Sequence, residues 1–387
     1  MAQRYDVAVA GGGPAGSAAA WHAAKAGARV VVFDKAEFPR DKPCGDGLTP
    51  RAVSLIQKMG LAAEVDKFHR VNGARIFSPS EWALSFPRRP GMPDHGYVAR
   101  RTEIDSVLLK QAESAGVEVR QGAEVVGAIV DDGRVTGVEL KTGERVLADA
   151  VIAADGAYSQ VKRSLRLESQ YHGYSAIAIR AEMSVAGPET DSLDIYLKLA
   201  FQGDQLPGYG WVFPLGGGRA NIGLGYCNSY KKWQQINATR LFGEFLSSLP
   251  RELGVPRIEE LRESRALQAW RLPMGFTAWP PWRPGVLFAG DALGAARPVS
   301  GAGISKALQS GTAAGECAVA ALTNGGPDDF TNYAQRVRSD WGAEYRRGRF
   351  FHRLVGIPAI ANTGIKVLDA VNHPGFRSRA LFWEGWR

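Results

Sequence analysis

The sequence predicts an α/β protein with three parts: a Rossmann-like domain with a parallel sheet, a second domain with a mixed or antiparallel sheet, and a helical C-terminal segment. Three observations predict it: a strand, glycine turn, helix and strand at the start, a middle section of strand patterns, and a late buried strand that leads into an Ala-rich helix. We expect a discontinuous first domain of residues 1–170 and 274–327, a second domain of 171–273 and a C-terminal segment of 328–387.

The opening follows the order strand, helix, strand. Residues Tyr5–Ala10 have the pattern of a buried strand, and Pro14–Gly27 have that of an Ala-rich helix. The continuous valines of Arg29–Asp34 indicate a parallel strand that is covered on both faces. The further elements expected in this domain are a helix over 103–115 that stops at Gly116, a strand over 117–120, a hairpin of Val135–Leu140 with Arg145–Leu147, buried strands at Val151–Ala154 and Gly285–Ala289, and a helix over Gly303–Ala321.

The pattern changes between about Tyr171 and Pro273, where short strand-like segments indicate a mixed or antiparallel sheet with one helix near 231–249. These segments are 174–185, 193–199, 209–215, 219–226 and 266–273. The C-terminal segment begins with a helical pattern, and we expect irregular backbone near Pro358 and Pro374.

Bulk properties exclude several classes of protein. With 387 residues, 45% of them apolar, the chain can bury a large core, which excludes disorder. Cys44, Cys227 and Cys317 form no CxxC motif and have no His at a metal-binding spacing, so we expect no metal site and no disulfide framework, as suits a cytoplasmic protein. Asp6 and the glycines interrupt the apolar start, which argues against a signal peptide, and no uninterrupted apolar window of about 18 residues predicts a transmembrane helix.

The net charge of +8 is unevenly spread, because arginines alternate with aromatic residues between Arg336 and Arg353. Three interpretations are open: an exposed helix face, a patch that attracts anionic lipid or an anionic substrate, or a nucleic-acid surface. No nucleic-acid-binding motif accompanies the run, so we expect no nucleic-acid partner. The second interpretation predicts peripheral contact with a membrane through this region of an otherwise cytoplasmic protein.

A glycine-rich turn, GGGPAG at residues 11–16, stands between the first strand and the first helix and fits GxGxxG. Its glycines permit a tight turn and close approach of the backbone to a pyrophosphate, and the helix start adds amide donors. An acidic residue at the end of the next strand would accept hydrogen bonds from a ribose diol. The residues predicted to hold a dinucleotide here are Gly11, Gly13, Pro14, Ala15, Gly16, Asp34 and Lys35.

Two later segments identify the dinucleotide. The ADG at 154–156 and the GDA at 290–292 each follow an expected strand and resemble signatures of FAD-dependent hydroxylases of the para-hydroxybenzoate hydroxylase-like superfamily. The resemblance implies FAD as the cofactor, with Asp291 hydrogen-bonded to its ribityl chain and Arg101, in an Arg-x-x-apolar-Asp segment, paired with its pyrophosphate. The other cofactor residues that it implies are Asp155, Gly290, and Pro298, Gly301, Gly303 and Ile304 of a loop and helix start facing the flavin pyrimidine.

Within this superfamily the chain resembles the geranylgeranyl reductases. DKPCGDGLTPRAV, residues 41–53, resembles their Cys-Gly-rich loop after the second strand. This loop leaves the ribose-binding end of the strand and would bring Cys44 and Gly45 to the flavin. Cys44 is then either a small residue beside the flavin ring or a participant in catalysis, because no partner supports a metal or disulfide role.

An aromatic segment, LPGYGWVFPLG at residues 206–216, resembles the Tyr-x-Trp-x-Phe-Pro segment of the same family. In an extended strand Tyr209, Trp211 and Phe213 share one face. Alone, this pattern is more typical of a strand that packs aromatics into its own core. With the resemblance, it favours a substrate-binding wall for a long apolar molecule.

The resemblance implies an FAD-dependent reductase that saturates isoprenoid C=C bonds of a hydrophobic substrate: a polyprenyl lipid, a quinone or a terpenoid. An isolated alkene is a poor hydride acceptor, so a proton must be delivered as well, and Tyr209, Cys44 and water are the candidates for its source. The chain has no second GxGxxG motif. The reductant is therefore either NAD(P)H, bound transiently, or a protein electron donor.

Other reactions remain open on the same fold. The strongest rival is an FAD-dependent monooxygenase that hydroxylates or epoxidises an aromatic or terpenoid natural product. A flavin halogenase fits less well, because Tyr209 and Phe213 stand where its motif has Trp and Ile, and a non-catalytic flavin sensor is weaker still. The segment Arg297–Ser300 departs from the Asn-Pro usual in the reductases, which leaves the substrate and the reaction type open.

Overall fold

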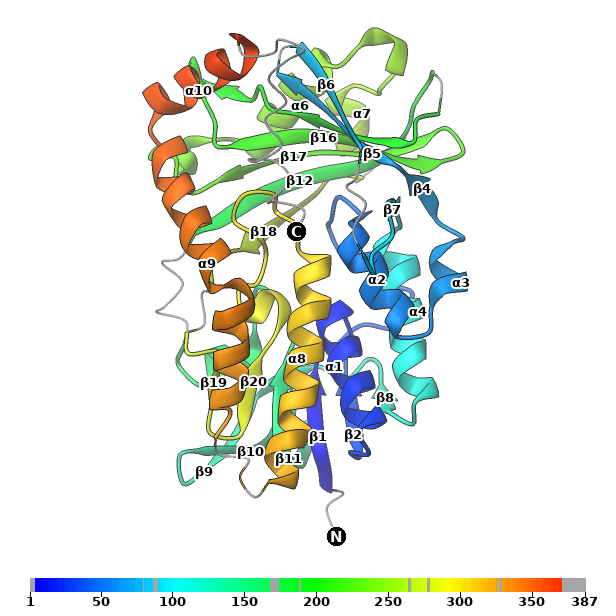
Figure 1. Ribbon diagram of the computed structural model, residues 1–387, viewed down its shortest axis with the longest axis vertical. Coiled ribbons are helices and arrows are strands. Elements are labelled where there is room, and N and C mark those ends of the chain that lie inside the picture. Colours follow the sequence, from blue (N-terminus) through cyan, green and yellow to red (C-terminus); the bar gives the residue numbers. More distant parts are fainter. Residues whose placement is uncertain are drawn as a thin grey trace.

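The computed structural model describes most of the chain. The described residues are 4–78, 80–85, 90–167, 174–187, 189–263, 266–276, 279–324, 326 and 329–370. Three predictions lie outside them, namely the domain junctions at 170 and 171 and at 327 and 328, and the irregular backbone near Pro374. Figure 1 shows a body around the parallel sheet in the lower half, a second sheet across the top, and the long helix α9 running beside the body toward the upper sheet.

An eight-stranded sheet forms the body. Its main path is β19-β20-β11-β1-β2-β8, and β10 pairs with β11 and with β9. The strands are β1 Arg4–Ala10, β2 Val30–Phe33, β8 Glu118–Arg120, β9 Val125–Asp131, β10 Arg134–Leu140, β11 Arg145–Ala153, β19 Trp282–Arg283 and β20 Val286–Phe288. The pairs β1–β2, β1–β11, β2–β8 and β11–β20 are parallel, which confirms the parallel sheet predicted from the sequence.

One strand of this sheet differs from its prediction. The sequence suggested two strands, at Arg145–Leu147 and Val151–Ala154, but β11 is continuous. Its first residues pair antiparallel with β10, as in the expected hairpin, and from Leu147 onward it pairs parallel with β1. The polar residue that interrupts the apolar pattern, Asp149, is only half-buried, because it lies on the face opposite the buried alanines and pairs with Arg4. Asp149 therefore does not interrupt β11.

The helices of the body pack on the sheet through small residues. They are α1 Pro14–Lys25, α4 Arg101–Ser114 and α8 Ile304–Thr323, each within two residues of its prediction at both ends, with the short α5 Gln160–Ser164. A Cβ atom on Gly311 of α8 would lie 2.0 Å from the carbonyl oxygen of Ala15 in α1. One on Gly315 would lie 2.3 Å from that of Ala19. The two helix backbones therefore approach each other as closely as glycine allows.

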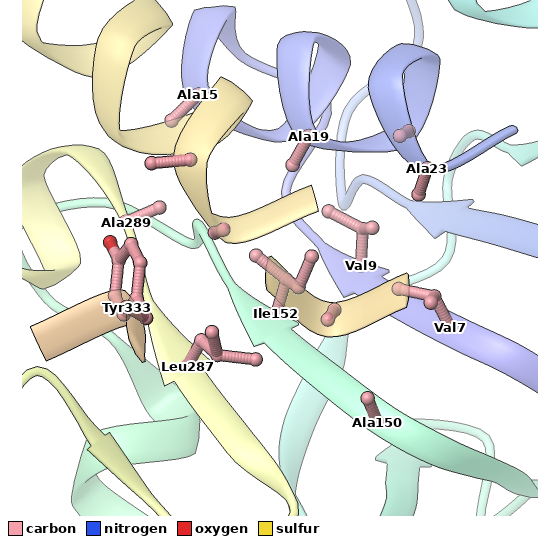
Figure 2. Close-up of a cluster of buried hydrophobic side chains, with 14 of the residues drawn as sticks. Val7, Val9, Ala15, Ala19, Ala23, Ala150, Ile152, Leu287, Ala289 and Tyr333 are labelled. Carbon is pink, nitrogen blue, oxygen red and sulfur yellow. The ribbon is translucent and has the colours of Figure 1, made fainter. Parts of the chain in front are cut away.

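The main core lies between this helix pair and the sheet. Figure 2 shows Val7 and Val9 of β1 pointing toward the alanines of α1, with Ile152 of β11 and Leu287 of β20 beside them. Tyr333 of α9, Thr331–Val355, closes the same cluster and donates a hydrogen bond of 2.7 Å to the carbonyl of Phe288. The C-terminal segment thus packs against the body.

A seven-stranded sheet makes the upper part. Its order is β18-β12-β17-β16-β13-β5-β6, and only β13–β5 is parallel among these pairs. The strands are β5 Gly73–Ser78, β6 Ser80–Ser85, β12 Ser175–Ser184, β13 Ser192–Tyr196, β16 Gly208–Gly216, β17 Arg219–Cys227 and β18 Gln268–Pro273. The strands predicted within 171–273 are present, in a largely antiparallel arrangement.

One face of this sheet is covered by helices. The helix expected near 231–249 is α6 Ala238–Ser248. It begins later than expected because Asn237 caps its start, accepting a hydrogen bond of 3.0 Å from the amide of Arg240. Phe242 and Phe245 of α6 lie in the core of this face. The smaller elements of this region are the 3-10 turns η2 Trp233–Gln235 and η3 Arg251–Leu253, the helix α7 Ile258–Glu263 and the pair β14 Ala200–Phe201 and β15 Asp204–Gln205.

Strands β5 and β6 come from a part of the chain that the sequence division assigns to the first domain. They extend the seven-stranded sheet by pairing beside β13. Their neighbours along the chain form a small three-stranded sheet, β3-β7-β4, with two helices: β3 Gly47–Leu48, α2 Pro50–Lys58, α3 Ala62–Val65, β4 His69–Val71 and β7 Gly96–Val98. The division stays a proposal, and these pairings associate β5 and β6 with the strands of its second domain.

The C-terminal segment continues from α9 into α10, Pro358–Ala370. The expectation of irregular backbone near Pro358 is confirmed by the break at Gly356 and Ile357 between the two helices. The helix resumes at Pro358 itself, because proline is tolerated in the first turn of a helix, where its missing N–H has no partner to lose. Within the described part of the chain, no helix has the length and apolar content that crossing a membrane requires.

Candidate active site

A cavity of about 2060 Å³ is lined by residues of both large sheets, the Cys44 loop, α8, α9 and α10. Ordinary ligand pockets measure about 300–1,000 Å³, so this one has room for a dinucleotide and a second molecule. Among the site residues predicted from the sequence, all but Gly16 line it: Gly11, Gly13, Pro14, Ala15, Asp34, Lys35, Cys44, Gly45, Arg101, Asp155, Tyr209, Trp211, Phe213, Gly290, Asp291, Pro298, Gly301, Gly303 and Ile304.

Two glycines of the turn, Gly11 and Gly16, have no space for a side chain. Gly11 has a left-handed φ of 97°, and a Cβ atom there would lie 2.4 Å from the carbonyl oxygen of Ala154. On Gly16, a Cβ atom would lie 1.8 Å from the carbonyl oxygen of Gly11. Gly16 therefore shapes the turn from behind, while Gly13 precedes the first turn of α1 without a side-chain cap. This leaves backbone amides at the helix start for an anionic group.

Two guanidinium groups stand beside this turn. Arg101 is buried and donates to both oxygens of Asp105, at 2.7 and 2.6 Å, and Arg40 donates to the same carboxylate at 2.9 Å. A Cβ on Gly13 would lie 3.4 Å from Nη2 of Arg40 and 3.9 Å from Nη2 of Arg101. Arg40 also lies 3.8 Å from Oδ2 of Asp34, so the two guanidinium groups face two carboxylates, and their remaining N–H donors beside the turn suit a pyrophosphate. Sequence reasoning missed Arg40, whose only signal is its place in the loop after β2.

Asp34 stands at the end of β2, as predicted. Its side chain is 8% exposed and accepts hydrogen bonds from the amides of Gly12, at 2.8 Å, and Ala36, at 2.9 Å. These bonds use part of its acceptor capacity, and a carboxylate retains further lone pairs for a ribose diol. Its predicted role therefore has the geometry that it needs.

Two further acidic residues face the cavity. Oδ2 of Asp155 accepts from the amide of Val161 at 3.1 Å, while its Oδ1 is buried and unpartnered among the described residues. Burial raises the pKa of Asp155. Asp291, in the 3-10 turn η4 Gly290–Ala292, pairs with Lys42 at 2.8 Å. The glycine turn, the guanidinium pair and these acids fit the phosphates, ribose and ribityl hydroxyls of FAD. Lys42 is a second residue that sequence reasoning missed.

The loop before α8 meets the aromatic strand. The hydroxyl of Tyr209 donates a hydrogen bond of 2.6 Å to the carbonyl of Ser300, and burial raises the pKa of Tyr209 well above its ordinary value. Gly301, with φ 64°, would carry a Cβ atom 3.4 Å from the same hydroxyl. The predicted pyrimidine-facing loop and the predicted substrate strand are therefore in direct contact.

Tyr209, Trp211 and Phe213 lie on one face of β16, which confirms the shared face predicted from the period of two. Their ring centroids are spaced 6.1 and 6.2 Å apart along the strand. All three line the cavity, and Trp211 and Phe213 are almost fully buried. Trp211 also donates from its indole nitrogen to Oδ1 of Asn221 at 2.9 Å. The three rings thus form an apolar wall, and their role in binding substrate stays a prediction.

The Cys44 loop packs against this wall. A Cβ on Gly45 would lie 3.3 Å from the ring of Phe213 and 3.4 Å from the indole nitrogen of Trp211. Cys44 is a free, half-buried thiol whose pKa is raised by burial and secondarily by the nearby carboxylate of Asp46. Asp46 is fully buried and also lines the cavity. In the sequence, Asp46 lies between Gly45 and Gly47, a pattern that is typical of a turn and gives no sign of a buried acid.

A buried charged cluster occupies the α8–α9 side of the cavity. Glu344 of α9 pairs with Arg297 at 2.7 Å and with Lys306 of α8 at 3.0 Å. Burial lowers the pKa of Lys306 to about 8, with a further contribution from the charge of Arg297. Arg51 adds a third cation to the same surroundings. Sequence reasoning missed this cluster, although Arg297 stood out as a departure from the Asn-Pro of the reductases.

The fold and the site define an FAD-dependent oxidoreductase with a large apolar cavity. Residues 4–344 match the family described as FAD binding domain. A menaquinone reductase from Mycolicibacterium smegmatis is 36% identical over 335 residues, which are 86% of this chain and 80% of the relative. Digeranylgeranylglycerophospholipid reductase 1 from Methanopyrus kandleri is 31% identical over 358 residues, 88% of this chain and 87% of the relative.

A solved structure agrees with these relatives. A geranylgeranyl bacteriochlorophyll reductase-like protein from Thermoplasma acidophilum has a TM-score of 0.83 at 26% identity and covers 98% of this chain and 94% of its own. The chain belongs to the geranylgeranyl reductase family of FAD-dependent oxidoreductases. It binds FAD, as the sequence predicted.

Proposed function

We propose that this protein saturates C=C bonds of an isoprenoid substrate, which is a polyprenyl lipid, a quinone side chain or a terpenoid. One observation carries the proposal: a single cavity joins the FAD-binding residues to the aromatic wall of β16, so an apolar chain along the wall reaches the cofactor. The relatives named above act on different molecules with an isoprenoid part in common. An isoprenoid chain is therefore the shared chemistry.

The chain's own residues bind, orient and exclude water in this proposal. FAD, once reduced, supplies hydride, which is chemistry that no side chain can provide. Apolar residues on other strands of the same sheet, Leu193 and Ile195 of β13 and Leu272 of β18, line the cavity together with the aromatic wall and bury the substrate chain. Burial of an isoprenoid contributes about 25 cal/mol per Å² of apolar surface and keeps the reacting bond away from water.

The electrons come from outside the chain. We propose NAD(P)H, bound transiently at the flavin face, or a protein electron donor. Chemical reduction under anaerobic conditions bypasses either donor, so the reductase proposal can be tested before the donor is known.

The test uses the purified protein with FAD, reduced anaerobically and mixed with a menaquinone or with a geranylgeranylated phospholipid. We expect flavin absorbance to return with bound substrate and a product that has gained two hydrogens in its isoprenoid chain. The same reduced protein mixed with oxygen and substrate tests the rival monooxygenase. An oxygenated product, with no anaerobic saturation of either isoprenoid, would overturn the proposal.

We further propose that the cavity opens toward a membrane surface at the junction of α9 and α10. Large apolar side chains are exposed there, with Phe350 63% exposed and Ile357 47%. Leu354 and Ile360 share this exposed region and also line the cavity. An exposed apolar patch that continues into the cavity is a route for a lipid substrate.

The arginines of α9 divide between two tasks. Arg336 pairs with Glu316 at 2.5 Å, and Arg349 donates to the carbonyl of Gly275 at 3.2 Å, so part of the basic run is used inside the molecule. Arg346 and Arg347 remain exposed one to two turns before the apolar patch. Exposed cations next to exposed apolar residues complement an anionic lipid surface.

Vesicle sedimentation tests the membrane proposal. We expect the protein to bind vesicles that contain anionic lipid and to bind neutral vesicles more weakly, with binding reduced by salt. The double substitution Phe350→Ser with Ile357→Ser should reduce binding at least tenfold and leave reduction of a detergent-dispersed substrate intact. Exposed Val130→Ser, on β9 in the body, is the matched control. Equal binding by the double variant and the control would reject this surface.

A further inference from the structure

Asp46 is a buried carboxyl group in the loop that carries Cys44. It is fully buried, yet it belongs to the cavity lining. Its Oδ2 accepts a hydrogen bond of 2.7 Å from Nδ2 of Asn221, while its Oδ1 is buried with no hydrogen-bond partner in the described part of the chain. A half-satisfied buried carboxylate is costly, so the neutral, protonated form is favoured here.

The backbone and one amide hold this carboxyl in place. Asp46 has a left-handed φ of 63°, and its carbonyl accepts a hydrogen bond of 2.9 Å from the amide of Ala99. Nδ2 of Asn221 also donates to the carbonyl of Cys44 at 2.7 Å, and Oδ1 of Asn221 accepts from Trp211 at 2.9 Å. A single side-chain amide therefore links Asp46 to the thiol loop and to the aromatic wall. Strained backbone of this kind is concentrated at functional sites.

The charges around Asp46 are engaged by other groups. The titratable groups that face it are Arg100, Arg101, Arg180, Glu182 and Cys44. Each guanidinium has a separate carboxylate within 2.8 Å: Arg100 has Glu182, Arg101 has Asp105 and Arg180 has Asp41. Each cation near Asp46 is therefore already paired with another carboxylate and stabilises the charged form of Asp46 only in part.

Burial therefore dominates and raises the pKa of Asp46 to about 7. The charge of Arg180, the hydrogen bond from Asn221 and the charge of Arg101 lower the pKa by less than burial raises it, and Glu182 raises it further. A general acid is most effective when its pKa lies near the operating pH. Perturbed acids in a cavity are frequent at active sites.

The two side chains that the sequence suggested as proton sources, Tyr209 and Cys44, are weaker acids than Asp46. The hydroxyl hydrogen of Tyr209 is already donated to the carbonyl of Ser300, and burial raises the pKa of Tyr209. Burial also raises the pKa of the Cys44 thiol. Both groups hold their protons more tightly than Asp46 at neutral pH.

We propose that Asp46 stores the proton that completes saturation of the alkene, an inference that rests on the proposed reductase function. One alkene carbon gains a hydride from the reduced cofactor, and the π bond breaks. The other carbon gains a proton as the O–H bond of the Asp46 carboxyl breaks. The carboxylate that remains takes a proton from the solvent before the next turnover. The alkene thus gains two hydrogen atoms in total, one as hydride and one as a proton.

A direct titration of the Asp46 carboxyl group tests whether it holds a proton near neutral pH, without any turnover. Infrared difference spectra of the FAD-loaded protein, taken at about one pH unit below and above neutrality, should show a protonated carboxyl band that disappears at the higher pH. The band should be absent from Asp46→Asn. Asp194→Asn is the matched control, because Asp194 is also buried on β13 but pairs with Arg75 at 2.6 Å and does not line the cavity. A band that persists in Asp46→Asn would overturn the proposal.

Single-turnover substrate reduction by chemically reduced protein is the second readout. In the wild type the rate should fall about tenfold per pH unit above about 7, and in Asp46→Asn it should be about 10²-fold lower with no break near that pH. Asp46→Glu should restore part of the rate. A rate in Asp46→Asn within twofold of wild type, with the same pH profile, would reject Asp46 and leave the reductase proposal standing.

A variant that keeps Asp46 covers the case in which Asp46→Asn does not fold. Asn221→Ala removes a hydrogen bond that lowers the pKa of Asp46, so the break in the pH profile should move to higher pH. A purely structural role for Asn221 would lower the rate at every pH without moving the break. That result would count against Asp46 as the proton source. If the wild type saturates no isoprenoid at all, the reductase proposal fails, and the infrared titration still decides whether Asp46 exchanges a proton near neutrality.

Discussion

The body around the parallel sheet depends on glycines where backbone approaches backbone, whereas the upper sheet with its aromatic wall also uses glycines to make room for aromatic rings. In the body, a Cβ on Gly11, Gly16 or Gly311 would meet backbone carbonyl oxygens at 1.8 to 2.4 Å. In the upper sheet, a Cβ on Gly208 would also meet a backbone oxygen, that of Gly225 at 2.1 Å, but one on Gly210 would meet the ring of Phe245 at 2.4 Å. A Cβ on Gly45, in the Cys44 loop beside this sheet, would meet the ring of Phe213 at 3.3 Å. Backbone cannot be replaced, whereas a ring can.

This difference separates a part of the molecule that is rigid by necessity from a part that can change. The glycine turn and the α1–α8 contact hold the cofactor side by backbone approach, so no alternative side chain fits there. The wall over the cavity is defined by side-chain packing, so its shape can vary with its residues. A common cofactor with variable substrates requires this division.

The largest effect should follow from a side chain in the glycine turn. Gly16→Ala places a Cβ 1.8 Å from the carbonyl oxygen of Gly11, and we expect loss of FAD binding and a fall of about 3 kcal/mol or more in the free energy of unfolding. Gly342→Ala on α9 is the control, because its Cβ would meet only the side chains of Arg338 at 3.5 Å and Arg346 at 3.7 Å and Gly342 does not line the cavity, so it should cost less than about 1 kcal/mol and leave FAD binding unchanged. Flavin absorbance and denaturant unfolding measure both. Similar losses of FAD binding and of unfolding free energy in the two variants would show that the close backbone contact at Gly16 is not the cause.

The second prediction tests whether the upper sheet can be repacked. Gly210→Ala alone should lower the free energy of unfolding by about 1–3 kcal/mol, because of the clash with Phe245. Adding Phe245→Leu should recover part of that loss, with a coupling of about 0.5–3 kcal/mol in a double-mutant cycle.

The matched pair in the body is Gly311→Ala with Ala15→Gly, which leaves the opposing carbonyl oxygen in place, and it should show no recovery. Equal recovery in both pairs would show that backbone and side-chain contacts do not differ as proposed.

The last prediction concerns pH, and it arises where the two regions meet. The pKa of Asp46 rises from 3.8 to about 7 on folding, so between these values the folded state holds a proton that the unfolded state has lost. The contribution of this group to stability is complete below about pH 4 and is lost as the pH rises toward 7, by roughly 1.4 kcal/mol per pH unit. Asp46→Asn should remove this slope, and unfolding at several pH values compares it with wild type. Parallel curves for the two proteins would contradict the raised pKa.

Much of the cofactor side could be predicted from the sequence. GGGPAG, the end of β2 and the two Asp-containing turns all lie at the predicted edge of the sheet, because their chemistry depends on local backbone conformation and on strand order. The period of two placed Tyr209, Trp211 and Phe213 on one face for the same reason.

Other features depended on contacts between distant segments. Arg40 and Lys42 stand in the same short loop, yet the first pairs with Asp105 of α4 and the second with Asp291 of η4. Strands β5 and β6 join the upper sheet across more than a hundred residues of chain, through the parallel pairing with β13. No local pattern contains this information.

The sequence by itself determined the FAD-binding fold, the cofactor motifs and the aromatic face, since glycine conformation and strand periodicity are properties of short segments. Only the tertiary structure decided the state of Asp46. In the sequence it is one polar residue in a glycine-rich turn, but Asn221 of β17 and the loss of water around it make it an acid with a pKa near neutrality. Burial is a property of the whole packed molecule, so the charge state of a group cannot be inferred from its neighbours in sequence.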